Sequence, residues 1–448
     1  MLALAAVLFG LQLVAARPAA QLHHASRNHP RAAPKAPRSL PYVKTLATLS
    51  YMPTVQSASY VNLTHMMPKV IDNAIAITSH SWEFGVLTQT LLEVYSPNLA
   101  PFDWITGALG NQDYLPFMLC NVTANELSSY DWSGAPSDGA DSNLNDYLWD
   151  STSKKTLSPQ PLLDGAGSLG DPASLGVAAW VLAHYADQVS GQLSSVQDDD
   201  AYAWAVGNQL AYLYAGYESD NGTISQREGY FEVWADMGYM ISPFMAYLGL
   251  ATSNTTLLTA ALNQWTLDSS ALLDTSVNLY RHVNTFDARF WATGNAWMLQ
   301  GLMRILASID SAGQTDNMGT SVSTAETTAA NVFTALFNQL TSDGRLPNYM
   351  LTDDSTLSIA DSTGTAGVVA AFYRFYIRRP DLAKALTTKA AQAFDGVVAK
   401  IDSSFWLTDV VDPLGTNGFI VTPGSGTQSP EGQSFVALMW AARTAAKI

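Results

Sequence analysis

Cysteine is nearly absent from this sequence, which has one, Cys120, in 448 residues. A single cysteine cannot form an intrachain disulfide, so a disulfide framework is excluded as a source of stability. The fold must therefore be stabilised by a hydrophobic core. The chain has ample material for one, because 48% of its residues are hydrophobic and 10% are aromatic.

Charged residues are also scarce, at 13% of the chain against about a quarter in ordinary soluble domains. Basic residues are the scarcer kind, with 22 Lys and Arg against 38 Asp and Glu, and six of the 22 lie in residues 1–44, which contain no acidic residue. A protein that binds nucleic acid needs a basic face to neutralise phosphates. The acidic body of this chain therefore argues against a nucleic-acid partner.

Long apolar runs are missing after the first 16 residues. Residues 1–16 are apolar, with Val14 and Ala16 at the small-residue positions of a cleavage site, and we expect them to be a secretory signal peptide. The run is shorter than the roughly 20 residues that span a bilayer, so we expect a secreted protein without a membrane segment. Residues 17–45 are basic and rich in Pro and Ala, which predicts a disordered arm or pro-segment. Residues 46–448 are predicted to form a single domain.

The sequence contains four Asn-X-Ser/Thr acceptor sites for N-glycosylation. In a secreted eukaryotic chain such sites mark surface positions. We therefore expect N-glycans at Asn62, Asn121, Asn221 and Asn254.

Strand-like alternation is scarce, and helical periodicity dominates from about residue 60 onward. In 201–217, for example, Val206, Leu210 and Leu213 recur at the spacing that places them on one helix face. The best strand candidate is the short stretch 418–422. Helices are predicted over 83–95, 171–189, 201–217, 232–250, 256–273, 295–309, 324–341, 364–376, 380–399 and 431–446.

The predicted helices are separated by short connections rich in Gly, Pro, Asn and Asp, with no stretch long enough to be a linker between domains. Many of them carry Ala, Gly and Ser on more than one face. Such helices are expected to be covered on both sides, as in a two-layer arrangement. These features predict an all-α fold in one domain.

Asp236 is the first candidate catalytic residue. It lies in the predicted helix 232–250, between Trp234 and Tyr239, in otherwise aromatic and apolar surroundings. A carboxylate in such a place is costly unless it is hydrogen-bonded or functional. Partial desolvation would raise its pKa, as a general acid requires near neutral or mildly acidic pH. The structural alternative is an Asp that caps a neighbouring helix or is held by a buried amide.

The segment 280–297 combines aromatic and polar residues at the start of a predicted helix. Trp291 and Trp297 flank a Gly-Asn pair, in which Asn295 stands at the first position of that helix. Indole rings stack on sugar faces, and a helix N-terminus beside them suits recognition of hydroxyl and carboxylate groups. His282 precedes this group. The structural alternatives are an N-cap role for Asn295 and an ordinary core position for His282.

Asp171 is a second candidate carboxylate. It opens the predicted helix 171–189 and is followed by Pro172, a residue favoured at the first helical position. A simple N-cap explains this pattern as well as a catalytic role does.

Several stretches of this chain resemble the unsaturated glycuronyl hydrolases of glycoside hydrolase families 105 and 88. VWADMGYMISPF, which contains Asp236, resembles the segment with their catalytic aspartate. HVNTFDARFWATGNAW, which begins at His282, resembles their His followed by a W-x-R-G-N-G-W motif. LGDPASLGVAAW, which contains Asp171, resembles their L-D-D helix start with a second active-site aspartate. SHSWEFG, DSTGTA and SPEGQSFVALMWAA resemble further helices of that family, and the stretches follow its order from residue 79 to 442.

The resemblance implies an (α/α)6 barrel that uses neither a metal nor an organic cofactor. It also implies that Asp236 is the general acid and base, that Asp171 is its partner, and that the substrate is an oligosaccharide. The residues implied to line the sugar subsite are Trp234, His282, Trp291, Thr293, Asn295 and Trp297.

The reaction implied by the resemblance acts on a 4,5-unsaturated uronic acid at the non-reducing end of an oligosaccharide, such as a rhamnogalacturonan fragment of pectin. The acid protonates the C4=C5 vinyl ether, water adds at C5, and the resulting hemiketal opens to release the neighbouring sugar. One carboxyl group suffices, because it donates a proton and then activates the water.

Two positions depart from the family motif, since Thr293 stands where it has Arg and Ala296 where it has Gly. The planar fork of an Arg suits a uronate carboxylate, so this chain lacks the expected ligand for that group. Arg281 and Arg289 are candidates to replace it. Otherwise the substrate is neutral or the chemistry differs.

Two other functions fit the same sequence. An inverting glycosidase on the same barrel would use two carboxyl groups roughly 6.5–9.5 Å apart. These would be Asp236 with either Asp171 or Glu232, which lies four residues before Asp236 on the same face of the predicted helix. A degenerate barrel that only binds glycans would explain the missing Arg without any chemistry.

Overall fold

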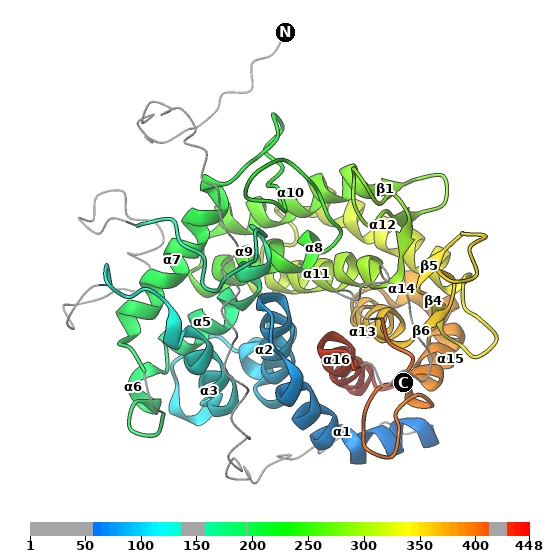
Figure 1. Cartoon of the computed structure of the whole chain (residues 1–448), viewed down its shortest axis with the longest axis horizontal. Helices are drawn as coiled ribbons and strands as arrows, with labels where there is room; N and C mark the ends of the chain where they lie inside the picture. Colours follow the sequence, from blue (N-terminus) through cyan, green and yellow to red (C-terminus); the bar gives the residue numbers. More distant parts are fainter. Residues whose placement is uncertain (1–56, 136–156, 194–195, 412–427) are drawn as a thin grey trace. The chain divides into compact units, whose positions relative to one another are not determined.

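The structure is a computed structural model, and it describes residues 57–135, 157–193, 196–411 and 428–448. The predicted signal peptide at 1–16, the arm at 17–45 and the strand at 418–422 lie outside these residues. Helices make up most of the described residues (Figure 1), which confirms the all-α prediction. Within the same residues, no helix has both the length and the apolar character to cross a membrane.

Six inner segments form a closed ring. They are α2 (Ser81–Tyr95), the 3-10 helix η5 (Asp171–Leu175) with α5 (Gly176–Ala183), α8 (Met237–Met240) with α9 (Ser242–Ala251), α11 (Ala292–Ser311), α13 (Ser362–Arg378) and α16 (Pro430–Ala446). Each segment packs against the next in this order, and α16 packs against α2. Figure 1 shows where the ring closes, with α16 (red) beside α2 (blue).

An outer layer of helices covers this ring, one before each inner segment. The outer helices are α1 (Ala58–Ile77), α3 (Phe117–Glu126), α7 (Asp199–Ala215), α10 (Thr255–Leu272), α12 (Gly319–Phe337) and α15 (Thr387–Val398). They pack on the ring: α1 on α16, α3 and α7 on α5, α10 on α9 and α11, α12 on α11, and α15 on α13. Six outer-inner hairpins of this kind make the (α/α)6 barrel that the sequence predicts.

The composition of the helices explains which layer each one joins. All eight residues of α5 are buried, and a helix that is apolar on every side must be covered on every side. The outer helix α15 instead buries Phe394 and Val397 and exposes Asp395 between them. Small residues let the inner helices approach closely: a Cβ on Gly301 of α11 would lie 1.7 Å from the carbonyl oxygen of Gly238 in α8. The small residues on several helix faces are therefore the contacts of the inner layer.

Three two-stranded antiparallel sheets lie in the connections that lead into α11 and α13. Strand β3 runs directly into α11, and β6 runs directly into α13, so the sheets fix where these inner helices begin. Strands of two residues are too short for an alternation pattern to reveal. The pairs are β1 (Leu273–Asp274) with β2 (Leu279–Tyr280), β3 (Phe290–Trp291) with β5 (Tyr349–Met350), and β4 (Leu346–Pro347) with β6 (Ala360–Asp361).

The predicted helix 232–250 begins later than expected. Residues before Asp236 are extended, because Trp234 forms an antiparallel bridge with Val283 and the Ala235 N–H donates to the carbonyl of His282 at 2.8 Å. Asp236 therefore stands at the N-cap of α8 and not inside a helix, and its side chain makes no capping hydrogen bond.

Other predicted boundaries also need correction. The predicted helix 171–189 is divided into η5, α5 and α6 (Ala186–Val189). Helix α11 begins at Ala292 with Trp291 as its N-cap, so the structural alternative in which Asn295 is the N-cap is wrong. The sequence pattern does not predict α1, because Pro68 interrupts it and a proline inside a helix is usually unfavourable.

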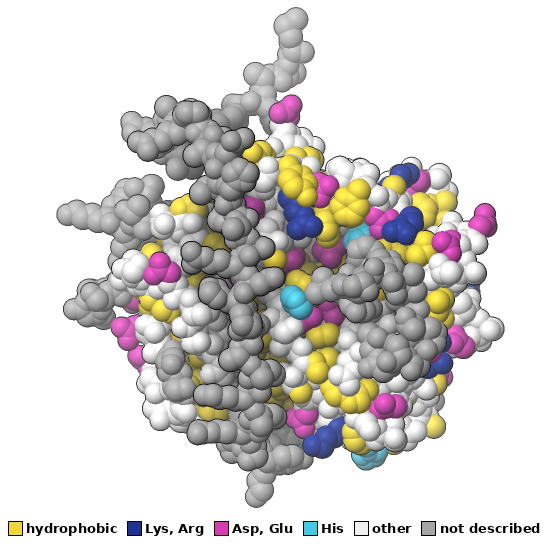
Figure 2. Space-filling view, in the orientation of Figure 1, with side chains coloured by type: hydrophobic (Ala, Val, Ile, Leu, Met, Phe, Trp, Pro, Cys, Tyr) yellow, Lys and Arg dark blue, Asp and Glu magenta, His cyan; other side chains and the backbone are white. Residues whose placement is uncertain are grey.

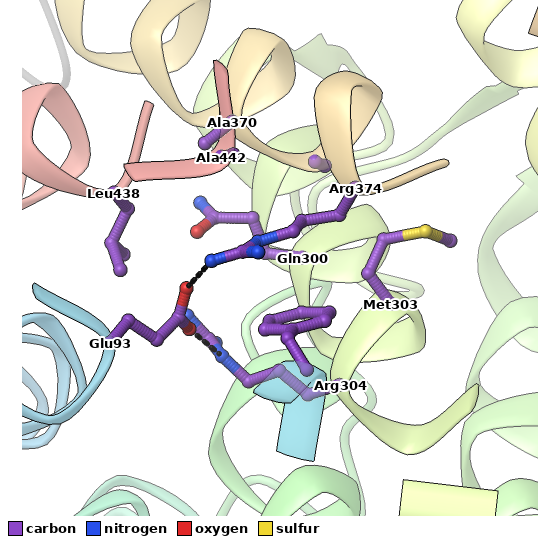
Figure 3. A pocket seen from close by; sticks show the side chains of 10 residues that line it. Glu93, Gln300, Met303, Arg304, Ala370, Arg374, Leu438 and Ala442 are labelled. Atoms are coloured by element: carbon purple, nitrogen blue, oxygen red, sulfur yellow. Dashed lines mark hydrogen bonds and ion pairs between the residues drawn. The ribbon is translucent and has the colours of Figure 1, made fainter. Parts of the chain in front are cut away.

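A buried ion-pair cluster lies among the C-terminal halves of the inner helices (Figure 3). Glu93 accepts from Arg304 Nε at 3.1 Å and from Arg374 Nη2 at 3.1 Å. The three side chains and Gln300 are among the residues that line a small cavity of about 10 Å³. Buried charges are tolerated only when they are paired, so the cluster ties α2, α11 and α13 together at this end of the ring.

Candidate active site

The N-terminal ends of the inner segments meet at the opposite end of the ring. They are packed tightly there: a Cβ on Gly85 of α2 would lie 1.9 Å from Ser174 Oγ of η5, and one on Gly364 of α13 would lie 2.7 Å from the Thr293 nitrogen of α11. Helix N-termini offer unpaired N–H groups and favour negative charge. Figure 2 shows acidic and histidine side chains near the middle of the face in view. The acidic residues at these helix ends are Glu83, Asp171, Asp236, Asp361 and Glu431.

Asp236 is poised to carry a proton. Its side chain is 19% exposed, and Oδ2 lies 3.9 Å from His282 Nε2. That oxygen is buried and has no hydrogen-bond partner among the described residues. Burial raises the pKa of Asp236, while the charges of His282 and Arg227 oppose the rise. An unpaired, partly desolvated carboxyl group of this kind suits a general acid.

Asp171 lies close enough to Asp236 for their charges to interact. Burial, and then the negative charge of Asp236, raise the pKa of Asp171 to about 7, although Gln226, Ser168 and Arg227 favour its ionised form. Gln226 Nε2 donates to Asp171 Oδ1 at 3.3 Å. Two carboxyl groups that repel each other titrate as a pair, so below neutral pH the pair holds at least one proton.

A network behind His282 fixes the orientation of its ring. His282 is 2% exposed, and its Nδ1 lies 2.8 Å from Asp287 Oδ2. Burial alone would raise the pKa of Asp287, but hydrogen bonds from His282, Arg289 and Tyr349 outweigh it and lower that pKa. The ionised Asp287 accepts the proton of Nδ1, so Nε2 is the nitrogen that faces Asp236.

Trp234 provides accessible aromatic surface beside Asp236 and His282. Its ring meets His282 edge-to-face, with ring centroids 5.7 Å apart, and meets Phe286 in the same way at 5.6 Å. Phe286 is 61% exposed. Trp291 is buried and also contacts His282, with ring centroids 4.5 Å apart. Partly exposed aromatic rings next to a carboxyl group are suited to stacking on a sugar.

The other residues expected to line the sugar subsite are buried. Thr293 Oγ1 donates to Asp361 Oδ2 at 3.3 Å. Asn295 has no exposed surface, and Trp297 packs edge-to-face between Tyr239 and Phe435. The structure therefore places all three beneath the site, where they support it from within α11.

Asn295 joins β2 to the start of α11. Its Oδ1 accepts from the Tyr280 N–H at 2.9 Å, and its Nδ2 donates to the carbonyls of Tyr280 at 2.9 Å and Trp291 at 2.8 Å. This amide holds the strand that precedes His282 against the helix that follows Trp291. It thereby fixes Tyr280 and Trp291, which lie at the two ends of the loop that carries His282.

The two arginines expected to replace the family Arg are held by other carboxylates. Arg281 Nη2 lies 2.7 Å from Asp274 Oδ2, and Arg289 Nε lies 2.6 Å from Asp287 Oδ1. The geometry expected of Glu232 is also wrong, because this residue precedes α8 in an extended segment. Glu232 instead accepts from Thr285 Oγ1 at 2.6 Å and from Trp234 Nε1 at 3.0 Å, so each of its carboxylate oxygens already accepts a hydrogen bond.

A second pair of buried carboxyl groups lies where α16 meets α2. Burial, and then the charge of Glu83, raise the pKa of Glu431 to about 7. Trp82 Nε1 donates to Glu431 Oε1 at 2.5 Å, and the Trp82 ring stacks on His80 with centroids 4.6 Å apart. The sequence marks this region only as a stretch that resembles an inner helix.

Four further residues join the site that the sequence predicted. Asp287, Phe286, Gln226 and Arg227 come from the two loops before α8 and α11, where no helical or strand pattern singles them out. The spacing of His282, Asp287 and Arg289 within one short loop is the only local signal for the network. Within the described ranges, no group of three or more His, Cys, Asp or Glu side chains is arranged to hold a metal ion.

A barrel of six helical hairpins with acidic side chains at the helix N-termini defines a class of carbohydrate-active enzymes, the six-hairpin glycosidases. The sequence profile described as Glycosyl Hydrolase Family 88 matches residues 185–418, about half of the chain. The chain belongs to this glycoside hydrolase family. No curated protein sequence matches it closely.

Solved structures agree with the fold. A possible member of family GH105 from Salmonella enterica serovar Paratyphi A is 15% identical, with 91% of this chain and 99% of that one covered and a TM-score of 0.62. A family 88 glycosyl hydrolase from Bacteroides vulgatus is 16% identical, with 86% and 99% covered and a TM-score of 0.55. An unsaturated glucuronyl hydrolase specific for heparin is 14% identical, with 88% and 99% covered and a TM-score of 0.54. At these identities the likeness establishes the fold alone.

Proposed function

We propose that this glycoside hydrolase removes a 4,5-unsaturated uronic acid from the non-reducing end of pectin-derived, rhamnogalacturonan-type oligosaccharides. The observation that carries the proposal is the environment of Asp236. Its buried Oδ2 has no hydrogen-bond partner among the described residues, and Asp171 and His282 lie beside it. Such a carboxyl group can hold a proton at mildly acidic pH, and no hydrogen bond from its Oδ2 to another described residue competes for that proton.

The chemistry needs one carboxyl group at the reacting carbons. Asp236 gives its proton to C4 of the vinyl ether, and positive charge develops at C5, where the ring oxygen stabilises it. A water molecule attacks C5 and gives a proton to the Asp236 carboxylate, which restores the acid. The hemiketal then opens by cleavage of the C5–O5 bond, which gives a ketone at C5 and a hemiacetal at C1. Collapse of the hemiacetal to an aldehyde breaks the C1–O bond and releases the neighbouring sugar with its own oxygen. In this scheme Asp171 and Asp236 share a proton, and Asp171 helps to retain it. His282 Nε2 lies 3.9 Å from Oδ2 of Asp236.

Secretion and N-glycosylation are also part of the proposal. The apolar residues 1–16 support export. Asn62 and Asn221 are exposed, which suits glycan attachment, whereas the Asn254 oxygen accepts from the Leu257 N–H at the start of α10. Expression in a eukaryotic secretory host should give protein in the medium that loses mass on enzymatic removal of N-glycans.

The proposal is tested with rhamnogalacturonan that has been digested by a polysaccharide lyase. The wild-type protein should abolish the ultraviolet absorbance of the C4=C5 bond as the neighbouring sugar is released. Asp236→Asn should lower the rate by about 10²- to 10⁴-fold, the range expected for loss of a general acid. An unchanged absorbance with folded wild-type protein would overturn the proposal. Cleavage of saturated oligosaccharides in its place would favour an ordinary inverting glycosidase.

A further inference from the structure

Arg227 lies near Asp171 and Asp236, because its neighbour Gln226 donates to Asp171 Oδ1 and its own guanidinium lies over the ring of Trp234, two residues before Asp236. Its charge acts on both Asp171 and Asp236, favouring their ionised forms. Arg281 and Arg289, by contrast, each form a short ion pair with a carboxylate of their own loop. Among the described residues, Arg227 thus combines nearness to Asp171 and Asp236 with only one long ion pair, in which its Nε lies 4.0 Å from Oε2 of Glu232.

The backbone fixes Arg227 at this place. Arg227 and Ser168 form an antiparallel bridge, which joins its loop to the one that leads into Asp171. Its neighbour Gln226 reinforces the junction, because the Gln226 carbonyl accepts from the Leu169 N–H at 2.7 Å and Nε2 donates to Ser168 Oγ at 2.8 Å. The backbone of Arg227 is therefore fixed against the segment that leads into Asp171.

The guanidinium of Arg227 lies over an aromatic ring and is incompletely paired. Its guanidinium carbon is 4.5 Å from the centroid of the Trp234 ring, and 28% of the side chain is exposed. Nε is buried and forms no hydrogen bond, since the nearest carboxylate oxygen, Oε2 of Glu232, is 4.0 Å away. Stacking leaves the edge of a guanidinium open, and that edge is what binds a carboxylate in a bidentate manner.

Glu232 explains why the guanidinium remains available. Its two oxygens already accept from Thr285 and from the indole N–H of Trp234. At 4.0 Å it balances part of the charge of Arg227 without forming a hydrogen bond to Nε. The same carboxylate therefore positions both Trp234 and Arg227 on one side of Asp236.

We propose that Arg227 binds the carboxylate of the unsaturated uronate and so replaces the arginine that the family motif carries where this chain has Thr293. Thr293 is buried and hydrogen-bonded to Asp361, so the cation has moved from the start of α11 to the loop before α8. The inference rests on the proposed function. It narrows the substrate class to sugars with a free carboxylate at C5 and excludes neutral or esterified ones as good substrates.

The test compares Arg227→Met and Arg227→Lys with Arg281→Met, a matched control in which the arginine is paired to Asp274. The substrates are the lyase-generated oligosaccharide and the same material with its carboxyl groups converted to methyl esters. We expect Arg227→Met to raise KM for the free acid by about 10- to 100-fold, as expected for loss of a charged hydrogen-bonded pair. The variant should leave the poor kinetics on the ester nearly unchanged, and Arg227→Lys should recover part of the loss.

The outcomes separate this inference from the proposed function. If the wild-type protein consumes no unsaturated substrate, the proposed function fails. If it does and Arg227→Met behaves like Arg281→Met, or loses equally on acid and ester, the assignment of Arg227 is overturned. Calorimetric binding of the unsaturated oligosaccharide to the Asp236→Asn protein, with and without Arg227→Met, gives the same comparison without turnover. Thermal unfolding of each variant excludes loss of the fold as the cause.

Discussion

At the scale of single residues, the site depends on how its environment divides protons among acidic groups. Asp287 is kept ionised by hydrogen bonds from His282 and Arg289. Asp171 keeps its proton to about pH 7, because it is buried and lies near a second negative charge. The hydrogen bonds of Asp287 therefore orient His282, while Asp171 holds a proton, and both groups act on Asp236.

The interaction between Asp171 and Asp236 predicts how kcat/KM changes on the alkaline side of its pH profile. A raised pKa means that the proton is retained as the pH rises and is lost only near pH 7. Because Asp171 and Asp236 interact and titrate as a pair, we expect kcat/KM to fall as the pair loses its last proton near that pH. In Asp171→Asn the fall should begin at lower pH, since Asp236 no longer faces a second acidic group while His282 and Arg227 still favour its ionised form. A rate profile of both proteins checks this, and coinciding alkaline limbs would contradict it.

At the scale of elements, the short strands and loops before the inner helices determine which side chains reach the site. The helical pattern predicts most of α10, α11, α13 and α16 to within a few residues, because their apolar faces repeat regularly. It misplaces the start of α8, where tertiary hydrogen bonds to the His282 loop override the local preference. Asp236 and Asp171 are recognisable from the sequence as unusual carboxylates. Arg227 and Phe286 are not, since they lie in loops whose conformation is set by contacts with distant segments.

The side-chain amide of Asn295 joins β2 to the start of α11, and a single substitution tests this contact. Asn295→Ala removes three hydrogen bonds and leaves the buried Tyr280 N–H without an acceptor. Each unsatisfied buried group costs about 1–3 kcal/mol, so we expect the free energy of unfolding to fall by about 2–4 kcal/mol. Urea unfolding measures this, with Asn263→Ala on the exposed side of α10 as the control, for which a change within about 0.5 kcal/mol is expected. Equal values for the two variants would show that the amide does not hold β2 to α11.

At the scale of the whole ring, the two ends differ in the residues that they carry. The C-terminal halves of α2, α11 and α13 are joined by the buried cluster of Glu93, Arg304 and Arg374 (Figure 3). The N-terminal ends carry the acidic residues, and the loops that precede them supply His282, Trp234 and Arg227. Loops at one end of the barrel can differ while the packing at the other end stays the same, which fits the proposal that Arg227 takes the role of the family arginine.

The measurement that tests the central claim most directly is the reaction in D2O, followed by NMR of the first-formed product. If Asp236 protonates C4, the released sugar acid carries one deuterium at C4, lacks the C4=C5 bond, and is not formed by Asp236→Asn. A released sugar that keeps its double bond and has no deuterium at C4 would contradict the account, because the bond to the neighbouring sugar would then have been cleaved as in an ordinary glycosidase.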